Sequence, residues 1–297
     1  MKIALIDVDS KIPNPPLMKI SAYHKAKGDS VEWHSAFNNY DCCYASKVFT
    51  FTPDYNYFPA CEVVRGGTGY DITTKLPNEI EKTNPDYSIY PKHKFSLQFF
   101  SRGCIRNCPF CAVRQKEGYI CPCEPMKLNP QGEYIEILDN NFFANPEWKM
   151  ASEQLIKWNQ RIKLNGVDVR IIDDEQCYYL NKFKHKRGIA IAWDNPKDDI
   201  LSKIKEMIKY VKPYKIQCYV LIGYWSTKEE DLYRVMKLDE LGVIPFVMPY
   251  RETDPQKIKL IDTTTDEYKQ NQKYMAKFAR WVNMRATFKS CTWQDYR

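Results

Sequence analysis

The 297-residue sequence has no long hydrophobic run, and no stretch approaches the roughly 20 apolar residues that a transmembrane helix needs. Internal repeats and low-complexity tracts are also missing. The first nine residues are too few, and become acidic too soon at Asp7, to act as a signal peptide. We therefore expect a cytoplasmic protein without a membrane partner.

Composition sets two further expectations. In the cytoplasm the 11 cysteines should be free thiols or metal ligands rather than disulfides. The formal net charge is +7, from 44 Lys and Arg against 37 Asp and Glu, and the lysines are spread along the chain. This mild excess permits a nucleic acid or another anionic partner but does not require one. The length suits one barrel-sized domain and a smaller one.

The most informative stretch is residues 102–118, where Cys104, Cys108 and Cys111 follow one another as C-x3-C-x2-C. Three thiolates on one tight loop can hold three corners of a cubane iron–sulfur cluster. Because the run has no fourth cysteine, one iron would stay open to a small chelating molecule. Gly103 lets the loop leave its strand sharply, and Pro109 stiffens the turn between the last two ligands.

A zinc site is the alternative, because Cys108-x2-Cys111 and Cys121-x-Cys123 would give four ligands. That interpretation leaves Cys104 unexplained, so the cluster is favoured. The corresponding alternative function is a zinc-stabilised nucleic-acid-binding module without catalysis. Cys121 and Cys123 could also hold a second cluster if other cysteines join them, and Cys123, Tyr250 or Cys291 could donate hydrogen to a radical. The further cysteines considered are Cys177, Cys218 and Cys291.

The first part of the chain alternates strand and helix patterns, which predicts a small open parallel sheet. Strands are expected at residues 2–8, 30–34, 44–52 and 62–65, with a helix over 17–27. The Gly-rich sequence at residues 66–69 opens no convincing helix. We interpret it as a tight turn rather than as a phosphate site.

From residue 94 onward, six strand patterns follow one another with helix patterns between most of them, which predicts an α/β fold with an open, partial barrel. The expected strands are 95–100, 134–138, 168–172, 189–193, 217–222 and 244–248, and the expected helices are 146–163, 174–186, 197–211 and 228–241. Prolines between residues 121 and 130 exclude a long first helix. A last helix over 265–281 should pack against the barrel. The predicted domains are therefore 1–91, 92–255 and 256–297.

The cysteine loop resembles the C-x3-C-x-aromatic-C signature of the radical S-adenosylmethionine (radical SAM) enzymes, with matches at Cys104, Cys108, Phe110 and Cys111. The resemblance implies a partial (β/α)6 barrel, a [4Fe-4S] cluster with S-adenosylmethionine on its open iron, and an external one-electron donor of the flavodoxin or ferredoxin type. It also implies reductive cleavage of SAM and hydrogen abstraction from a substrate by the 5′-deoxyadenosyl radical. The substrate is unknown, with nucleic acid and peptide both open.

The first ninety residues resemble a shortened cobalamin-binding domain, a small Rossmann-like parallel-sheet domain found before some radical SAM barrels. That family ligates cobalt through an Asp-x-His-x-x-Gly motif, which this sequence lacks. His24 and His34 do not stand in the required context. Cobalamin is therefore not expected.

The resemblance also implies contacts to SAM, which we expect at the carboxyl ends of the strands. Arg170 would meet the methionine carboxylate, or it would pair with Asp173 or Asp174 instead. Asp194 would meet the ribose, unless Asp194 or Asn195 caps a helix. The full set of candidate cofactor contacts is Phe110, Asp139, Asn140, Asn141, Arg170, Asp194, Gly223 and Pro249.

Overall fold

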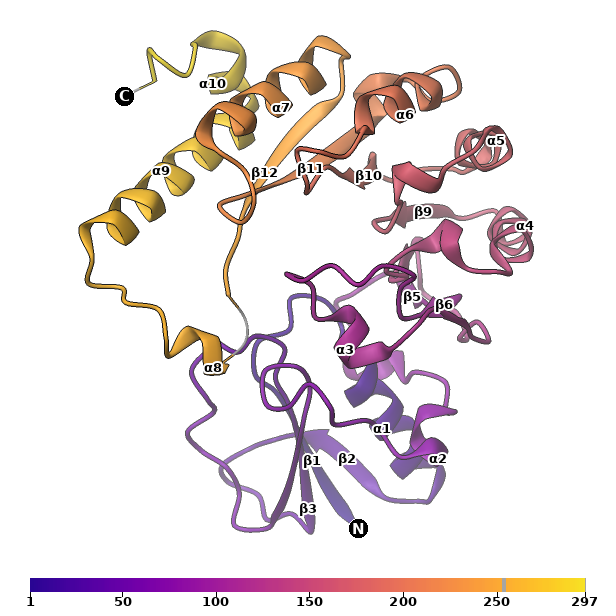
Figure 1. Ribbon diagram of the computed structural model, residues 1–297. Helices are drawn as coiled ribbons and strands as arrows, with labels where there is room; N and C mark the ends of the chain where they lie inside the picture. The colour runs from indigo at the N-terminus through magenta and orange to yellow at the C-terminus, as the bar shows by residue number, and fades with distance from the viewer. Residues whose placement is uncertain (253–254, 297) are drawn as a thin grey trace.

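A computed structural model describes residues 1–252 and 255–296. The fold is mixed α/β, with three parallel sheets and one short antiparallel pair of strands. The amino-terminal sheet lies at one end of the molecule and the carboxyl terminus at the other (Figure 1). Within the described part of the chain, no helix has both the length and the apolar character needed to cross a bilayer.

The amino-terminal sheet is parallel throughout, as predicted, with strand order β2-β1-β3-β4. Its strands are β1 (Lys2–Asp7), β2 (Ser30–Trp33), β3 (Cys42–Ser46) and β4 (Glu62–Gly66), and helix α1 (Pro15–Ala26) connects β1 to β2. Leu17 and Ile20 of α1 are buried in one cluster with Ile3 and Leu5 of β1. The short helices α2 (Asn78–Glu81) and η1 (Tyr87–Ile89) follow the sheet.

The predicted strand over residues 44–52 is wrong in its second half. Strand β3 begins two residues earlier and ends at Ser46. The backbone N–H groups of Val48 and Phe49 then donate to the Asp9 carboxylate, at 2.7 and 2.9 Å. Because these donors are used by a side chain, they cannot extend the hydrogen-bond ladder of the sheet.

The second region contains two three-stranded parallel sheets, β5-β8-β9 and β10-β11-β12. The strands are β5 (Ser96–Gln98), β8 (Tyr134–Ile137), β9 (Arg161–Leu164), β10 (Ile189–Ala192), β11 (Ile216–Ile222) and β12 (Ile244–Pro249). Between the two sheets, Ile162 of β9 exchanges hydrogen bonds of 2.8 Å with Lys184 and Lys186, just before β10. The strands thus follow one another in chain order.

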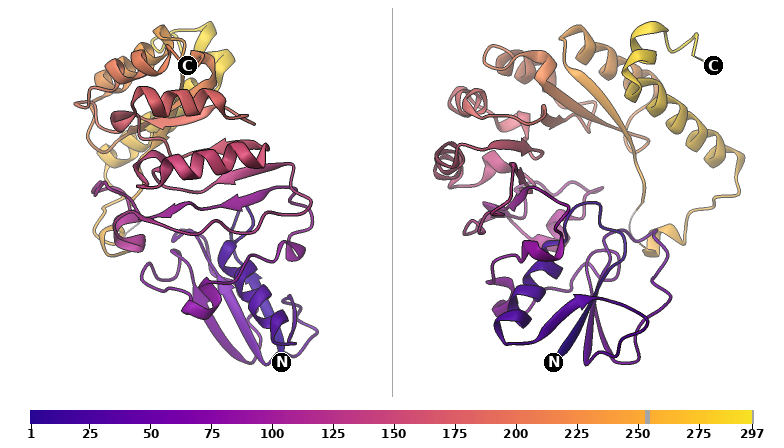
Figure 2. Two further views of the ribbon diagram at one scale, coloured as in Figure 1. Left: turned by 90° about the vertical axis from the view of Figure 1, so that its right-hand side faces the viewer. Right: turned by 180° about the vertical axis from the view of Figure 1, so that it is seen from behind.

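The connecting helices lie on one side of these strands, on the outside of the arc (Figures 1 and 2). They are α4 (Trp148–Trp158), α5 (Asp174–Lys182), α6 (Ile200–Met207) and α7 (Lys228–Glu240). One continuous buried cluster runs from Phe100 through both sheets to Phe288. The short helices η2 (Phe142–Ala144) and η4 (Pro213–Lys215) complete the connections.

The predicted third strand at 168–172 is wrong. The strand is β9, seven residues earlier, and residues 169–171 form the short helix η3 (Val169–Ile171). Helix α4 ends at Trp158 because Asn159 adopts a left-handed conformation (φ 56°), a usual way to end a helix. After β9, Asp168 accepts a hydrogen bond from the Arg170 N–H at 3.2 Å and closes a turn instead of extending a strand.

The connection from β5 to β8 is irregular, as the prolines predict. It contains the antiparallel pair β6 (Ser101–Arg102) and β7 (Cys121–Pro122) and the short helix α3 (Val113–Glu117). After the small helix α8 (Pro255–Ile258), α9 (Asp266–Asn283) and α10 (Arg285–Ser290) close the chain. The Asn283 side chain bonds both the N–H and the C=O of Val247, at 2.7 and 3.0 Å, so α9 lies on the free edge of β12.

Candidate functional site at the cysteine loop

The cysteine loop, residues 102–118, leaves β6 through a narrow neck that only glycine fits. Gly103 has φ +80°, and a Cβ atom there would lie 2.5 Å from the Tyr119 carbonyl oxygen and 2.7 Å from that of Gly118. The Cys104 N–H reaches the Gly118 carbonyl at 3.3 Å. The two ends of the loop therefore touch, as the sequence suggested for Gly103.

Glu117, at the end of α3, clamps this neck. Its carboxylate accepts hydrogen bonds from Arg102 Nε and Nη2 (3.1 and 2.9 Å), from the Gly103 N–H (3.0 Å) and from Asn140 Nδ2 (3.0 Å). Burial opposes the charged form, but the hydrogen bonds and the charge of Arg102 outweigh it and lower the pKa of Glu117. No pattern in the sequence pointed to Glu117.

Helix α3 also ties the loop to the amino-terminal sheet. The Lys116 ammonium donates a hydrogen bond of 2.7 Å to Thr68 Oγ1, in the Gly-rich turn after β4. Burial lowers the pKa of Lys116. In that turn, a Cβ atom on Gly67 would lie 2.4 Å from the Lys47 carbonyl oxygen, which agrees with its interpretation as a tight turn.

The three predicted metal ligands share the loop as free thiols. Cys104 Sγ accepts the Arg106 N–H at 3.4 Å, and the Cys111 N–H donates to the Cys108 carbonyl at 3.0 Å. Burial raises the pKa values of Cys108 and Cys111, and the charges of the neighbouring thiols add to the rise. Over residues 1–252 and 255–296, no three Cys, His, Asp or Glu side chains converge on one point as metal ligands would. The triad stays a prediction.

Of the other cysteines, Cys121 pairs with Arg102 at the base of the loop, whereas Cys177, Cys218 and Cys291 lie elsewhere. Cys177 and Cys218 are buried in the core, and Cys291 follows α10, where its carbonyl accepts a hydrogen bond from Trp281 Nε1. Burial raises the pKa of Cys123 to about 12, and Asp139 is the charge that raises it most. A second cluster or a zinc site that uses Cys121 and Cys123 has no assembled ligand set in the described residues.

A cavity of about 220 Å³, which we call the polar pocket, borders the loop. Four of the predicted site residues line it: Cys108, Phe110, Arg170 and Asp194. Arg106, Asn107, Asn195, Asp198 and Trp225 complete the lining. The structure therefore brings the middle of the loop, residues 106–110, together with the segments that follow β9, β10 and β11.

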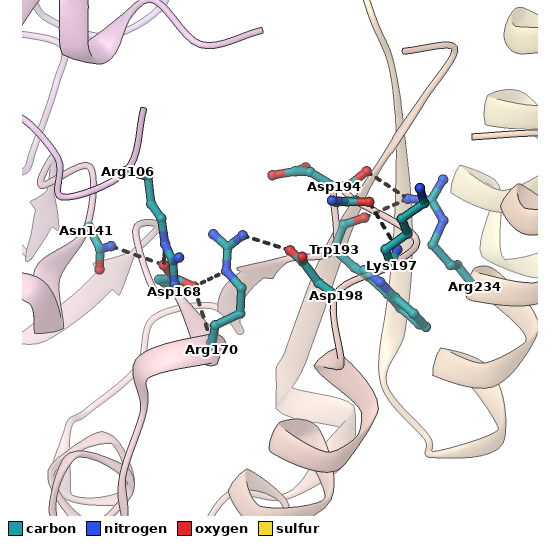
Figure 3. Close-up of polar contacts among 10 residues, drawn as sticks. Arg106, Asn141, Asp168, Arg170, Trp193, Asp194, Lys197, Asp198 and Arg234 are labelled. Carbon is teal, nitrogen blue, oxygen red and sulfur yellow. Dashed lines mark hydrogen bonds and ion pairs between the residues drawn. The ribbon is translucent and has the colours of Figure 1, made fainter. Parts of the chain in front are cut away.

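Charged side chains on one wall of the polar pocket already pair with each other (Figure 3). Asp168 accepts Arg106 Nε at 2.9 Å and Arg170 Nε at 2.7 Å, and Arg170 Nη1 continues to Asp198 at 2.9 Å. Burial is the largest influence on Asp168, but its bonds to Arg170 and Arg106 lower its pKa. The predicted alternative partners of Arg170, Asp173 and Asp174, are wrong, because Asp168 and Asp198 hold it.

Asp194 faces this wall from the end of β10. Figure 3 shows its carboxylate directed away from Arg234, which instead bonds the Asp194 carbonyl at 3.3 Å. Burial raises the pKa of Asp194 to about 6, and the nearby charges of Arg170 and Arg234 limit the rise. Asp199, not Asp194 or Asn195, caps helix α6, so the capping alternative is wrong.

The three residues after β8 have different environments. The buried Asp139 carboxylate accepts the Phe100 N–H at 2.9 Å and the Ser101 hydroxyl at 2.6 Å, and burial raises its pKa to about 6. Asn140 bonds Glu117. Asn141 Nδ2 reaches Asp168 at 3.4 Å, whereas its Oδ1 is buried and has no hydrogen-bond partner among the described residues. Of the three, only Asn141 offers an unused buried acceptor.

The remaining candidates lie near the ends of β11 and β12. The Phe110 ring packs edge-on against Tyr224 and Trp225, with centroids 5.6 and 5.4 Å apart. Gly223 has φ +79°, and a Cβ atom there would lie 2.1 Å from Met275 Sδ of helix α9. Pro249 is the last residue of β12 and pairs with Ile222. Trp225 was not predicted; its position two residues after Gly223 was the available signal.

Comparison with known proteins gives no match that bears on this geometry. No model of a protein family matches the chain, and no curated protein is significantly similar to it. A function therefore has to be argued from the residues of the loop and of the polar pocket.

Proposed function

We propose that this protein is a radical SAM enzyme. It would bind a [4Fe-4S] cluster through Cys104, Cys108 and Cys111 and S-adenosylmethionine in the polar pocket. The observation that carries the proposal is the position of the C-x3-C-x2-C loop, whose Cys108 and Phe110 line the same cavity as Arg170 and Asp194. An external one-electron donor and an unknown substrate complete the proposal.

The arrangement of strands supports a partial (β/α)6 barrel as the scaffold. The six strands of the second region run parallel in chain order, and Ile162 joins the two sheets through its bonds to residues 184 and 186. In parallel barrels, ligands bind at the carboxyl ends of the strands. The polar pocket is lined by residues that follow β9, β10 and β11, which is the expected place.

The chemistry of the loop fits a cluster. All three cysteines are free thiols, one of them already accepts a backbone N–H, and hydrogen bonds to sulfur are a recognised means of tuning cluster potentials. Bound there, the cluster would supply the electron for reductive cleavage of SAM, chemistry that belongs to the cofactor rather than to the protein. The protein holds the loop in place through Gly103 and Glu117.

The polar pocket offers groups of the right type for SAM. Within it, Arg170 would pair with the carboxylate, and behind its wall Asn141 Oδ1, which has no hydrogen-bond partner among the described residues, would accept a hydrogen bond from the amino group. Asp194 would accept hydrogen bonds from ribose hydroxyls. Phe110 and Trp225 would border the adenine. Asp139 and Asn140 act one step away, by holding the loop and Glu117.

Anaerobic purification and reconstitution test the proposal. We expect a brown protein with about four iron and four sulfide per chain. Cys108→Ala should lose the iron, whereas the matched control Cys61→Ala should keep it, because Cys61 lies before β4 in the amino-terminal sheet. Arg170→Met and Asp194→Asn should keep the iron and weaken SAM binding. A colourless protein with one zinc per chain would refute the proposal.

A further inference from the structure

A second and larger cavity lies at the carboxyl edge of the amino-terminal sheet. Its volume is about 610 Å³, within the range of small-molecule sites. Asp7 ends β1 and Ser10 follows it, and Trp33 and His34 stand at the end of β2. In open parallel sheets, ligands bind beyond the carboxyl ends of the strands, where neighbouring connections diverge to opposite sides. In the order β2-β1-β3-β4 the connections diverge between β1 and β3, and the cavity, which lies over β1 and β2, stands next to that point.

Aromatic side chains form most of the wall, so we call this cavity the aromatic pocket. Trp33 and Tyr90 pack edge to face with centroids 5.1 Å apart, and Tyr90 continues to His93 at 6.0 Å. On the other side, His34 contacts Tyr55, whose hydroxyl lies 2.9 Å from His34 Nδ1. These rings offer faces and edges to a flat ligand.

Two residues of the aromatic pocket can bind an anion, away from its one carboxylate. The Asp7 carboxylate accepts the Ser10 N–H at 3.0 Å on one oxygen and the Tyr90 hydroxyl at 2.5 Å on the other. The segment between η1 and β5, residues 90–95, closes the pocket, and we call it the linker. Its residues Lys92 and His93 bring donors that carry or can carry positive charge. The second ring nitrogen of His34 is a further donor or acceptor.

The backbone does not provide the usual phosphate site of such a sheet. Helix α1 begins with Pro15 and Pro16, which have no N–H, and Asn14 already caps the Leu17 N–H. The Gly-rich turn after β4 is closed on Lys47. An anionic group in this pocket would therefore bind to the side chains of the linker and not to a helix end.

We propose that the aromatic pocket binds a nucleotide, with the base between the rings of Trp33, Tyr55 and Tyr90 and the phosphate at Lys92 and His93. His24 uses both ring nitrogens, toward Asp29 at 2.7 Å and Tyr44 at 3.0 Å, whereas His34 uses Nδ1 toward Tyr55. The nucleotide can be free or part of a single strand, since both present a base and a phosphate.

Calorimetric titration of the full-length chain with adenosine 5′-monophosphate tests the site. The titration is repeated in Cys104→Ala/Cys108→Ala/Cys111→Ala, which removes the proposed cluster and with it the SAM site. We expect one-to-one binding in both proteins. Lys92→Ala and His93→Ala should each weaken it about ten-fold, the usual effect of losing a hydrogen bond to a charged group. Lys94→Ala is the matched control, because this lysine contacts Gln131 outside the pocket.

Three results would overturn the proposal: no binding, equal affinity for adenosine and its monophosphate, or binding unchanged in both linker variants. Comparison with a short single-stranded oligoadenylate then identifies the source. Tighter binding of the oligonucleotide indicates a strand, tighter binding of the monophosphate indicates a free nucleotide, and either result retains the site. Because the triple cysteine variant binds without a cluster, failure here leaves the proposed radical SAM function untouched.

Discussion

The two pockets occupy equivalent places, at the carboxyl edges of parallel sheets, but charged side chains line one of them and aromatic side chains line the other. The polar pocket is small, and its charged residues Arg106, Arg170 and Asp198 are held by ion pairs before any ligand arrives. The aromatic pocket is almost three times larger and is shaped by rings, with its positive groups on a linker. The sheet edge thus provides the location, whereas the side chains decide the chemistry.

The largest expected effect on stability comes from Arg234, which contacts the polar pocket through the backbone of Asp194. Its buried guanidinium bonds the carbonyls of Trp193 and Leu221 at 2.8 and 2.9 Å and the Asp231 carboxylate at 2.7 Å. Arg234→Met should lower the unfolding free energy by about 3–5 kcal/mol, because Asp231 stays buried without its partner. Urea denaturation measures this loss.

The control for Arg234 lies on the same helix. Lys237 pairs with Glu240 at the surface, so Lys237→Met should cost no more than about 0.5 kcal/mol. Equal losses in the two variants would mean that the polar pocket does not depend on its buried arginine.

A smaller effect, dependent on pH, is expected at Asp139. Burial raises its pKa from 3.8 to about 6, so the unfolded chain ionises at lower pH than the folded one. Stability should therefore fall as pH rises through this window, by about 3 kcal/mol for two pKa units. Asp139→Asn removes the ionisation, and its stability relative to the wild type should increase from pH 4 to pH 7. Unfolding curves across that range test the sign; the exposed Glu133→Gln is the control.

Glu117→Gln should loosen the neck of the cysteine loop. The carboxylate accepts four hydrogen bonds, two of them from Arg102, and their partial loss should cost about 1.5–3 kcal/mol. Because the pKa of Glu117 is lowered, this contribution is present above its ordinary pKa and lost as pH falls below it. Limited proteolysis at residues 104–112 reports the loosening. Cleavage as fast in the exposed Glu124→Gln control would count against the clamp.

The smallest effect is expected in the aromatic pocket. Trp33 Nε1 donates to the Ile89 carbonyl at 3.0 Å and holds the linker. Trp33→Phe keeps a ring but removes this hydrogen bond, for about 0.5–1 kcal/mol. Hydrogen exchange should then be faster at residues 89–93. Trp225→Phe, in the polar pocket, should leave that exchange unchanged; faster exchange in both would contradict the separation of the two pockets.

Much of the fold could be predicted because its strands are buried and apolar. The helix of residues 17–27, the parallel amino-terminal sheet and five of the six later strands follow directly from periodicity. The third later strand was misplaced, since the apolar residues around Arg170 imitate a strand. Asn159, a residue that often ends helices, and the alternation at 161–164 were the overlooked signals.

The site was predictable only in part. The cysteine spacing pointed to the loop, and the order of the strands brought Arg170 and Asp194 into its pocket. The partners of Arg170 could not be predicted, because Asp168 meets it within a turn that was expected to be a strand and Asp198 reaches it from the segment after β10. The role of Glu117 depends on the neck at Gly103, a contact between chain segments that no local pattern encodes.

The hydrogen bond from Lys116 to Thr68 spans 48 residues of chain and joins the cysteine-bearing segment to the other half of the molecule. The segment is consequently attached to both halves, through Glu117 to Arg102 on one side and through Lys116 to Thr68 on the other. A hinge motion between the halves must therefore either break the hydrogen bond from Lys116 to Thr68 or move the cysteine thiols with it. The angle between the two halves would then set the position of the sulfur atoms.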